Sequence, residues 1–260
     1  MTGRRIPLHD IAGFKGMRRA GRLAAQTLDF IGGHIRAGIS TAELDRLCED
    51  FMRAGGGIPA TIGYHGYQHA SCISVNHVVT HGIPSDDKIL TDGDILNIDV
   101  TPLLDGWHGD SSRMYVVGKV PVKAKRLVGA TYEAMMAGIE AVRPGATLGD
   151  VGHAIAKVAA RERFSIVRDF CGHGVGRVFH DAPQVMHDGR PGTGVTLEPG
   201  MIFTIEPMLN AGFAEVKVLS DGWTAVTRDR SLSAQFEHSV GVTETGVEIF
   251  TLSENNTVLS

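Results

Sequence analysis

The sequence has few cysteines, no long apolar run and no excess of basic charge, and each shortage excludes a class of protein. Its three cysteines, in 260 residues, are too few and too far apart for a disulfide framework. Nowhere do about 18 apolar residues occur together, as a membrane-spanning helix requires. The net charge of −4 argues against nucleic acid as the primary partner. We therefore expect a cytoplasmic protein whose main partners are neither membranes nor nucleic acid.

The chain also lacks an export signal and an interdomain linker. Arg4 and Arg5 are followed by no apolar stretch of signal-peptide length. No segment rich in Pro or Ser divides the chain, and 43% hydrophobic with 21% charged residues is typical of a globular protein with a substantial core. We expect a single domain over residues 1–260, acting as a monomer.

One phrase occurs twice, at a spacing of 107 residues. Residues 90–99 and 197–206 agree in residue or charge type at five positions, and each ends an apolar strand with an acid, Asp99 in one and Glu206 in the other. Burying a carboxylate costs several kcal/mol unless a cation or hydrogen-bond donors meet it. Two such acids, brought together by pseudo-symmetry, predict a cation site between the halves.

A second repeat has the same spacing. Residues 36–44 and 143–151 both place Ser40 or Thr147 three positions before an acid, the pattern of a capping box that opens a helix. Two matches at one offset make chance the weaker explanation. We expect an internal duplication with halves at about 10–120 and 121–250.

Apolar spacing predicts the helices. Residues at intervals of three or four positions predict helices over 14–35, 41–54, 127–142 and from Thr147 to 158. Each half therefore has two helices followed by strands.

The predicted strands are separated by short turns, of which Asp105-Gly106 and Asp221-Gly222 are typical of hairpins. Helices that cover one side of an antiparallel sheet predict the α+β class. The expected strands cover 95–101, 107–117, 201–206, 214–219, 223–227 and 235–242.

The turn at Asp105-Gly106 fixes the register of its hairpin. With a two-residue turn, Asp110 lies opposite Thr101, and Ser112 lies opposite Asp99. Because side chains alternate faces, the two aspartates then share one face, about 7 Å apart at the backbone. A one-residue change in the loop would send Asp110 to the other face. The alternative is two acids on a solvated hairpin, which the apolar flanking residues disfavour.

The second half adds further donors. Glu206 ends a strand, Glu237 alternates with an apolar set, and His173 lies in a glycine-rich stretch that does not fit the dinucleotide fingerprint. Four carboxylates and one imidazole suit Mn²⁺, Fe²⁺, Co²⁺ or Zn²⁺ in an open catalytic site. Because carboxylates can bridge two ions that activate a bridging water, hydrolysis is the leading chemistry.

A set of specific motifs extends along nearly the whole chain. They are Tyr64-His65-Gly66-Tyr67, Val75-Asn76-His77-Val78-Val79-Thr80-His81-Gly82-Ile83-Pro84, Asn97-Ile98-Asp99-Val100, His108-Gly109-Asp110-Ser111-Ser112, the run around His173, Thr204-Ile205-Glu206-Pro207-Met208 and Gln235-Phe236-Glu237-His238. Together they resemble the motifs of the type I methionine aminopeptidases, metallopeptidases of family M24 with the pita-bread fold. The spacing from Glu206 to Glu237 leaves no room for the helical subdomain of type II members, and no N-terminal extension is expected.

The resemblance implies a function and a set of site residues. The activity would be removal of the initiator methionine from peptides and nascent chains, with a small second residue preferred and ribosome association left open. A dinuclear centre of Co, Mn, Fe or Zn would have Asp99, Asp110, His173, Glu206 and Glu237 as ligands. Glu206, His81 and His180 would be catalytic, and the substrate would be bound by Tyr64, Tyr67, Cys72, His81, Phe179, His180 and Trp223.

Other interpretations stay open at this point. A lone His is more often structural than catalytic, and the aromatic residues and Cys72 could simply be core. Thr80 and Thr61 depart from the family, in which Cys is frequent at or near these positions. A proline-directed peptidase of the same fold, or a peptide-binding protein without catalysis, would use related sequence features.

Overall fold

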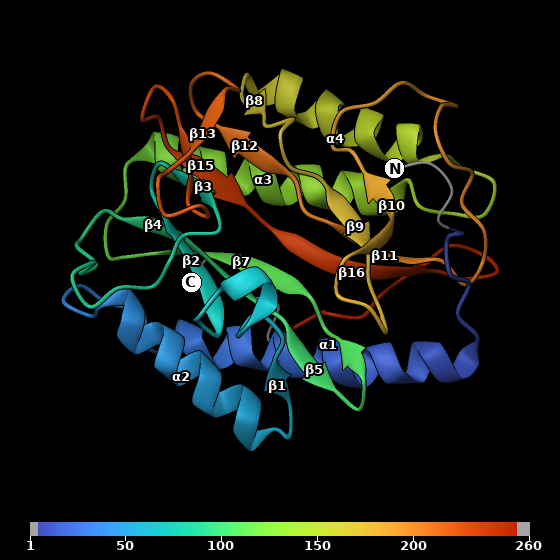
Figure 1. Ribbon diagram of the computed structural model, residues 1–260. Helices are drawn as coiled ribbons and strands as arrows, with labels where there is room; N and C mark the ends of the chain where they lie inside the picture. Colours follow the sequence, from blue (N-terminus) through green and yellow to red (C-terminus); the bar gives the residue numbers. More distant parts are fainter. Residues whose placement is uncertain (1–4, 254–260) are drawn as a thin grey trace.

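The chain folds around a curved antiparallel sheet with a pair of helices along each of two sides (Figure 1). This computed structural model describes residues 5–253, so Arg4 of the expected N-terminal pattern lies outside the described residues. In Figure 1 one helix pair lies below the sheet and the other above it. The helices are α1 (Ile11–Gly32), α2 (Thr41–Ala54), α3 (Val122–Glu140) and α4 (Leu148–Glu162), with a short 3₁₀ turn at Tyr64–Gly66.

The central sheet joins strands from both parts of the chain. It runs, in spatial order, through β10 (Asp181–Val185), β9 (Gly172–Gly174), β11 (Ile202–Ile205), β16 (Glu237–Val242), β7 (Ser111–Val116), β4 (Ile95–Val100) and β2 (Ser71–Val75), and β17 (Val247–Ile249) pairs with β16.

Three small sheets flank the central one. They are β1 (Ile58–Pro59), β5 (Pro102–Leu104) and β6 (Trp107–His108); β15 (Ser233–Gln235), β12 (Met208–Asn210) and β8 (Ser165–Ile166); and β13 (Val216–Val218), β14 (Ala225–Thr227) and β3 (Val78–Thr80).

Helices α2 and α4 begin where the sequence predicts a cap, whereas α1 and α3 begin earlier than predicted, at Ile11 and Val122 instead of residues 14 and 127. The Ser40 side chain accepts from Glu43 N, and Thr147 and Asp150 form a complete capping box. Two helix ends were predicted too late: Ile35 and Val142 lie beyond α1 and α3. Both still pack against the core from the following loops, so their apolar spacing misleads at the helix ends.

The register of the first hairpin is confirmed, but its strands are interrupted. Leu104 pairs with Trp107, and Asp99 pairs with Ser112. The predicted continuous strands 95–101 and 107–117 are wrong at Thr101 and at residues 109–110, and the strand 235–242 is broken at 236. A Cβ at Gly109 would come 2.2 Å from the Ala20 carbonyl oxygen. The backbone of α1 therefore lies very close to the hairpin at the point where the hairpin bends into a second sheet.

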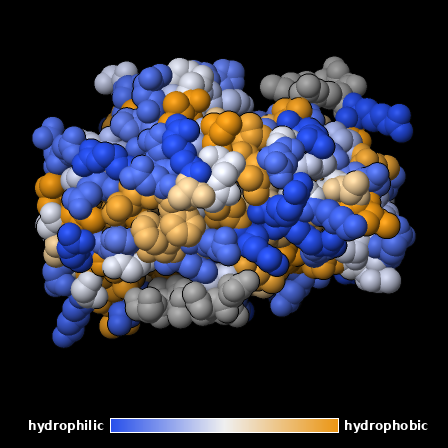
Figure 2. Space-filling view, turned by 90° about the horizontal axis from the view of Figure 1, so that it is seen from below, coloured by the Kyte–Doolittle hydropathy of each residue, from blue (hydrophilic) through white to orange (hydrophobic). Residues whose placement is uncertain are grey.

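The two helix pairs cover separate cores. Leu127, Val151 and Phe203 belong to the core under α3 and α4, while Leu28 and Leu44 belong to that under α1 and α2. Seen from below, hydrophilic and hydrophobic residues are interspersed on the molecular surface (Figure 2). Within residues 5–253, the helices do not combine the length and hydropathy of a membrane span.

Local contacts recur at a spacing of 107 residues. The amide of Leu90 bonds to the Ile39 carbonyl at 2.9 Å, and that of Leu197 bonds to the Ala146 carbonyl at 2.8 Å. Isolated bridges join Ser40 to Ile89 and Thr147 to Thr196. Each equivalent pair ties the loop before the second helix of its half to the loop before a central strand.

Candidate metal centre

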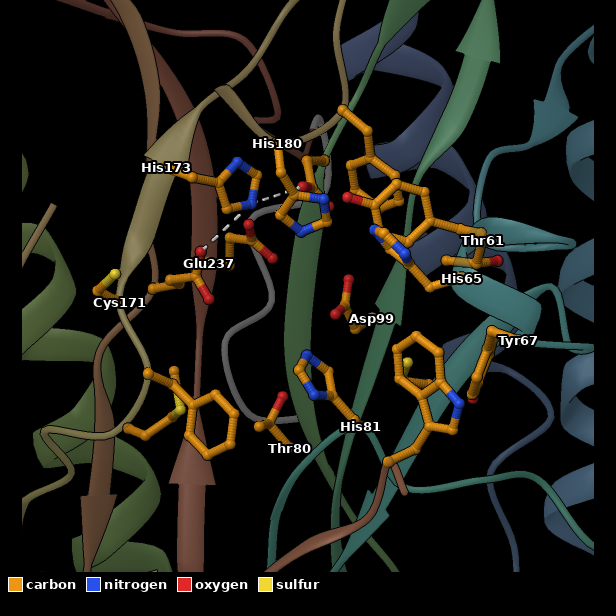
Figure 3. Close-up of a pocket in the computed structure, with 18 of the residues that line it drawn as sticks. Thr61, His65, Tyr67, Thr80, His81, Asp99, Cys171, His173, His180 and Glu237 are labelled. Carbon is orange, nitrogen blue, oxygen red and sulfur yellow. Dashed lines mark ion pairs between the residues drawn. The ribbon is translucent and has the colours of Figure 1, made fainter. Parts of the chain in front are cut away.

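A cavity of about 410 Å³ gathers the residues that the sequence singles out (Figure 3). Its walls come from both halves of the chain, and Asp99, His81, His173, His180 and Glu237 point into the same space. The sequence-predicted residues that line it are Tyr64, Tyr67, Cys72, His81, Asp99, Asp110, His173, Phe179, His180, Glu206, Trp223 and Glu237, with Thr61 and Thr80 also on its wall.

The register of the central sheet places several of these residues in one row. Cys72 pairs with Asp99, Asp99 with Ser112, and Ser112 with Glu237, across β2, β4, β7 and β16. Residues directly opposite on neighbouring strands share a face. Asp99 and Glu237 therefore face the same side of the sheet, with the small Ser112 between them.

Asp110 enters from the bend before β7. Thr101 Oγ1 donates to its Oδ1 at 2.7 Å, which fixes the carboxylate on the cavity face as the hairpin register requires. Asp110 is 3% exposed and Glu237 is 2% exposed. Neither carboxylate faces bulk solvent, and Asp99, the other acid of the hairpin, lines the cavity together with Asp110, so the solvated-hairpin alternative is wrong.

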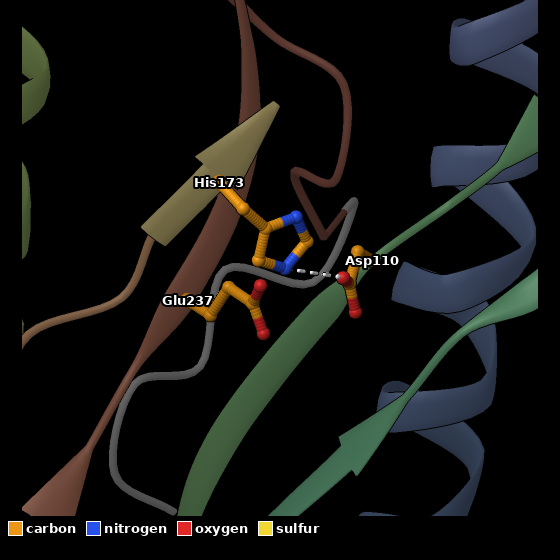
Figure 4. A group of neighbouring side chains, drawn as sticks. All are labelled: Asp110, His173 and Glu237. Carbon is orange, nitrogen blue, oxygen red and sulfur yellow. Dashed lines mark ion pairs between the residues drawn. The ribbon is translucent and has the colours of Figure 1, made fainter. Parts of the chain in front are cut away.

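His173 brings the imidazole to this group from β9. Its Nε2 lies 3.4 Å from Asp110 Oδ2 and 3.7 Å from Glu206 Oε1. Asp110, His173 and Glu237 each offer a ligand atom within 4.8 Å of the others (Figure 4). The backbone N–H of His173 also donates to Thr204 Oγ1, which in turn donates to Glu206 Oε1 at 2.7 Å.

The buried carboxylates of this cluster carry more negative charge than the nearby positive charge of the protein neutralises. Burial, and then the neighbouring Asp110 and Glu206 charges, raise the pKa of Asp99 well above its usual value, and burial and the other carboxylates do the same to the pKa of Glu237. Asp99 Oδ1 is buried without a hydrogen-bond partner. Such an orphaned oxygen among carboxylates and one imidazole fits divalent cations.

The pKa values of the remaining ligand candidates, His173, Glu206 and Asp110, are also shifted. Burial alone would lower the pKa of His173, but the Asp110 hydrogen bond and the Glu206 and Asp110 charges raise it to about 9. Burial raises the pKa of Glu206 to about 7, despite the His173 charge and the Thr204 hydrogen bond. Burial alone would raise the pKa of Asp110, but the hydrogen bond and charge of His173 lower it.

These shifts predict that the metal-free protein loses stability as pH rises above 7. A group with a raised folded pKa contributes stability below its unfolded pKa and loses it as pH rises through the folded value. For His173 this loss extends to about pH 9, whereas for Glu206 it is nearly complete by about pH 7. The opposing groups, whose folded pKa is lowered, act only below about pH 6.5; among them are His81, His180, His187 and His238, whose pKa values burial lowers.

We expect the Tm in chelator to fall by several degrees between about pH 7 and pH 9. Excess Mn²⁺ should abolish the fall, because metal binding displaces protons from the ligands and tightens with pH. Differential scanning calorimetry across this range measures both. A Tm in chelator that rises with pH would contradict the prediction.

The two other histidines lie beside this group. The ring centroids of His180 and His173 are 4.1 Å apart, and the His180 ring stacks on the Tyr64 ring with centroids 5.0 Å apart. His81 makes edge contacts with Phe170 and Trp223. Burial lowers the pKa of both His81 and His180 to about 4, so each is neutral at pH 7 and has one N–H donor.

Aromatic rings form the rest of the wall. The ring centroids of Tyr67 and Trp223 are 5.0 Å apart, and those of Tyr64 and Phe179 are 4.9 Å apart. The hydroxyl of Tyr67 donates to the Ser71 carbonyl at 2.9 Å, which fixes its ring over the buried Cys72 region. The centre therefore has a polar cluster on one side and an apolar aromatic surface on the other, as peptide-binding pockets do.

A model of metallopeptidase family M24 matches residues 15–244. The chain belongs to metallopeptidase family M24. It is therefore a hydrolase of the metal-dependent peptidases, and its structure has the pita-bread fold that M24 members share.

Its relatives in family M24 include bacterial methionine aminopeptidases. That of Rickettsia prowazekii is 57% identical over 250 residues, which are 95% of this chain and 96% of the relative, and that of Escherichia coli K12 is 51% identical over 243 residues. The Rickettsia prowazekii crystal structure has a TM-score of 0.94 and covers 95% of this chain and 100% of its own. Prolidase from Pyrococcus furiosus, at 22% identity and a TM-score of 0.76, shares the fold.

The M24 site also contains residues that the sequence analysis missed. Gln235 Nε2 donates to Glu206 Oε2 at 3.3 Å, and His187 Nε2 accepts from the Glu206 amide at 3.2 Å. Thr204 and Gln235 each stand two positions before a ligand candidate, so strand alternation could have found them. His187 has no such local signal. The cavity wall further includes His65, Asp169, Phe170, Cys171 and Met208.

Proposed function

We propose that the protein removes the N-terminal methionine from peptides and nascent chains by metal-dependent hydrolysis, with a small second residue preferred. The observation that carries this proposal is the convergence of buried carboxylates and one imidazole beside an aromatic pocket in a single cavity. Methionine aminopeptidases at 51% and 57% identity over nearly the whole chain support the substrate. No second candidate function is favoured by a feature of the site.

Two divalent ions complete the proposed centre. The protein ligands are Asp99, Asp110, His173, Glu206 and Glu237, and Co, Mn, Fe and Zn all match this donor set. Bound divalent ions supply Lewis acidity, which lowers the pKa of water and polarises a peptide carbonyl. The buried, unpartnered Asp99 Oδ1 supports this assignment.

Glu206 is the proposed general base. Its carboxylate is held on both oxygens, by Thr204 and by Gln235, so it presents a fixed acceptor toward the cavity. A base in this position takes the proton of the attacking water and delivers it to the leaving amine.

The two neutral histidines act on the peptide bond. The N–H of His180 donates to the carbonyl oxygen as that atom gains charge, a form of oxyanion stabilisation. His81 contacts the scissile nitrogen and steadies the departing amine. Because both rings are neutral, they supply hydrogen bonds without adding positive charge beside the cations.

The methionine side chain occupies the aromatic part of the cavity. Its thioether is flexible and makes favourable contacts with aromatic rings. The proposed wall consists of Tyr64, Tyr67, Cys72, Phe179 and Trp223, with Thr61 and Thr80 shaping its edge.

The wider setting is also part of the proposal. The chain is a single catalytic domain that arose by internal duplication, supported by the backbone contacts that recur at a spacing of 107 residues. It acts as a cytoplasmic monomer on nascent chains, close to the ribosome.

Release of methionine from Met-Ala-Ser tests the function. The protein is treated with chelator and then titrated separately with Mn²⁺, Co²⁺, Fe²⁺ and Zn²⁺, and free methionine is measured. We expect activity that depends on added metal, and little cleavage of X-Pro peptides. Metal-restored protein that cleaves X-Pro but leaves Met-Ala-Ser intact would replace this function with a proline-directed one, and inactivity on both would favour a binding protein.

A further inference from the structure

The segment that presents Phe179 and His180 to the cavity has no regular secondary structure. Residues 175–180 connect β9 to β10 through a series of bends. Phe179 contacts Tyr64, and His180 lies against both Tyr64 and His173. A segment without strand pairing owes its position to contacts from elsewhere in the fold, so those contacts determine where the pocket wall and the His180 N–H lie.

His108 supplies two of these contacts. Its backbone N–H and its Nδ1 both approach the Gly176 carbonyl oxygen, at 2.9 Å and 2.8 Å. Because a carbonyl only accepts, Nδ1 is the donor. The same imidazole stacks on Phe179 with the ring planes 12° apart and the centroids 5.5 Å apart. One buried side chain therefore holds both the beginning of the segment and the ring next to His180.

Residues next to His108 make further contacts between the segment 175–180 and the hairpin of β5 and β6. The Arg177 guanidinium lies 4.4 Å from the centre of the Trp107 ring, and Arg177 donates to the Asp105 carbonyl at 3.1 Å. A Cβ at Gly176 would lie 3.2 Å from His9 Nε2 and 3.4 Å from the Trp107 ring. The segment therefore lies in contact with the hairpin of β5 and β6.

We propose that His108 is a positioning residue, which sets the Met-pocket wall through Phe179 and the carbonyl-binding N–H of His180 through Gly176. The inference rests on the proposed function, because it assigns His180 and Phe179 their roles in it. His108 itself does not touch the substrate. Its two links are separable, since one uses the ring face and the other uses Nδ1.

Two substitutions separate the links. His108→Phe keeps a ring against Phe179 but leaves the Gly176 carbonyl with only the backbone donor, so kcat for Met-Ala-Ser should fall at least about tenfold with little change in KM. His108→Asn keeps a side-chain N–H near the position of Nδ1 but removes the stacking face, so KM should rise about tenfold and kcat should fall less. His153→Asn, on the exposed surface of α4, is the matched control and should behave as wild type.

Amide hydrogen exchange over residues 175–180 gives a readout that does not depend on catalysis. His108→Ala loses both links, so we expect faster exchange in this segment while the helices keep wild-type protection. Wild-type exchange there, or kcat and KM that change in parallel in both the Phe and Asn variants, would overturn the proposal. If wild-type protein with metal releases no methionine, the proposed function fails, whereas the exchange result still decides whether His108 holds the segment.

Discussion

Replacing Glu206 by Gln should lower kcat for Met-Ala-Ser by about 10³-fold, in the middle of the range for loss of a general base. Gln has nearly the shape of Glu and its oxygen can still accept from Thr204. It cannot take a proton from water, and it provides a weaker metal ligand. The variant therefore removes chemistry while the surrounding strand β11 keeps its pairing.

The measurement is steady-state release of methionine at saturating Mn²⁺, with metal content determined on the same sample. Glu215→Gln changes an exposed carboxylate in the same way and should keep the wild-type rate. A Glu206→Gln variant with wild-type kcat would remove Glu206 from the proton transfers. Glu206→Gln that is inactive because it holds no metal would instead show ligation to be its main contribution.

The parts of the fold that depend on local sequence could be predicted. Ser40 and Thr147 mark the starts of α2 and α4, because a side-chain oxygen that accepts an amide N–H at the first turn is a local interaction. The turn at Asp105-Gly106 fixes the pairing of Asp99 with Ser112, because a two-residue turn leaves one register. The register of the hairpin and the alternation of side chains along its strands together predicted that Asp99 and Asp110 lie on the same face.

The features that depend on contacts between residues far apart in the sequence could not be predicted. The strand break at Gly109 lies where the backbone of Ala20 in α1 approaches too closely for a Cβ, and no pattern within the hairpin reveals that approach. The His187 ring accepts a hydrogen bond from the Glu206 amide although His187 is distant in sequence, and the His108 ring in β6 stacks on Phe179 of the segment 175–180. The aromatic wall was expected only from the resemblance to a family, because burial of aromatic residues is equally expected in any core.

Replacing Asp99 by Asn should stabilise the metal-free protein at neutral pH and abolish its stabilisation by metal. The Asp99 carboxylate is buried among other acids, and one of its oxygens has no partner, so burying its charge is unfavourable without a cation. Asn removes that charge, and we expect the Tm in chelator to rise by a few degrees. With one ligand weakened, added Mn²⁺ should give little of the Tm increase it gives to wild type.

Asp110→Asn is the matched variant, and it should have the opposite effect in chelator. Asp110 is paired with His173 and accepts from Thr101, so its loss removes the nearer of the two carboxylates beside the buried His173 ring and costs about 3 kcal/mol. Both variants should lose metal-dependent stabilisation and Met release, which calorimetry with and without Mn²⁺ and the peptide assay measure. Equal destabilisation of both variants in chelator would mean that Asp99 is satisfied by the protein alone. Opposite signs would identify Asp99 as a buried carboxylate that the protein alone does not stabilise, as expected for a ligand that requires a bound cation.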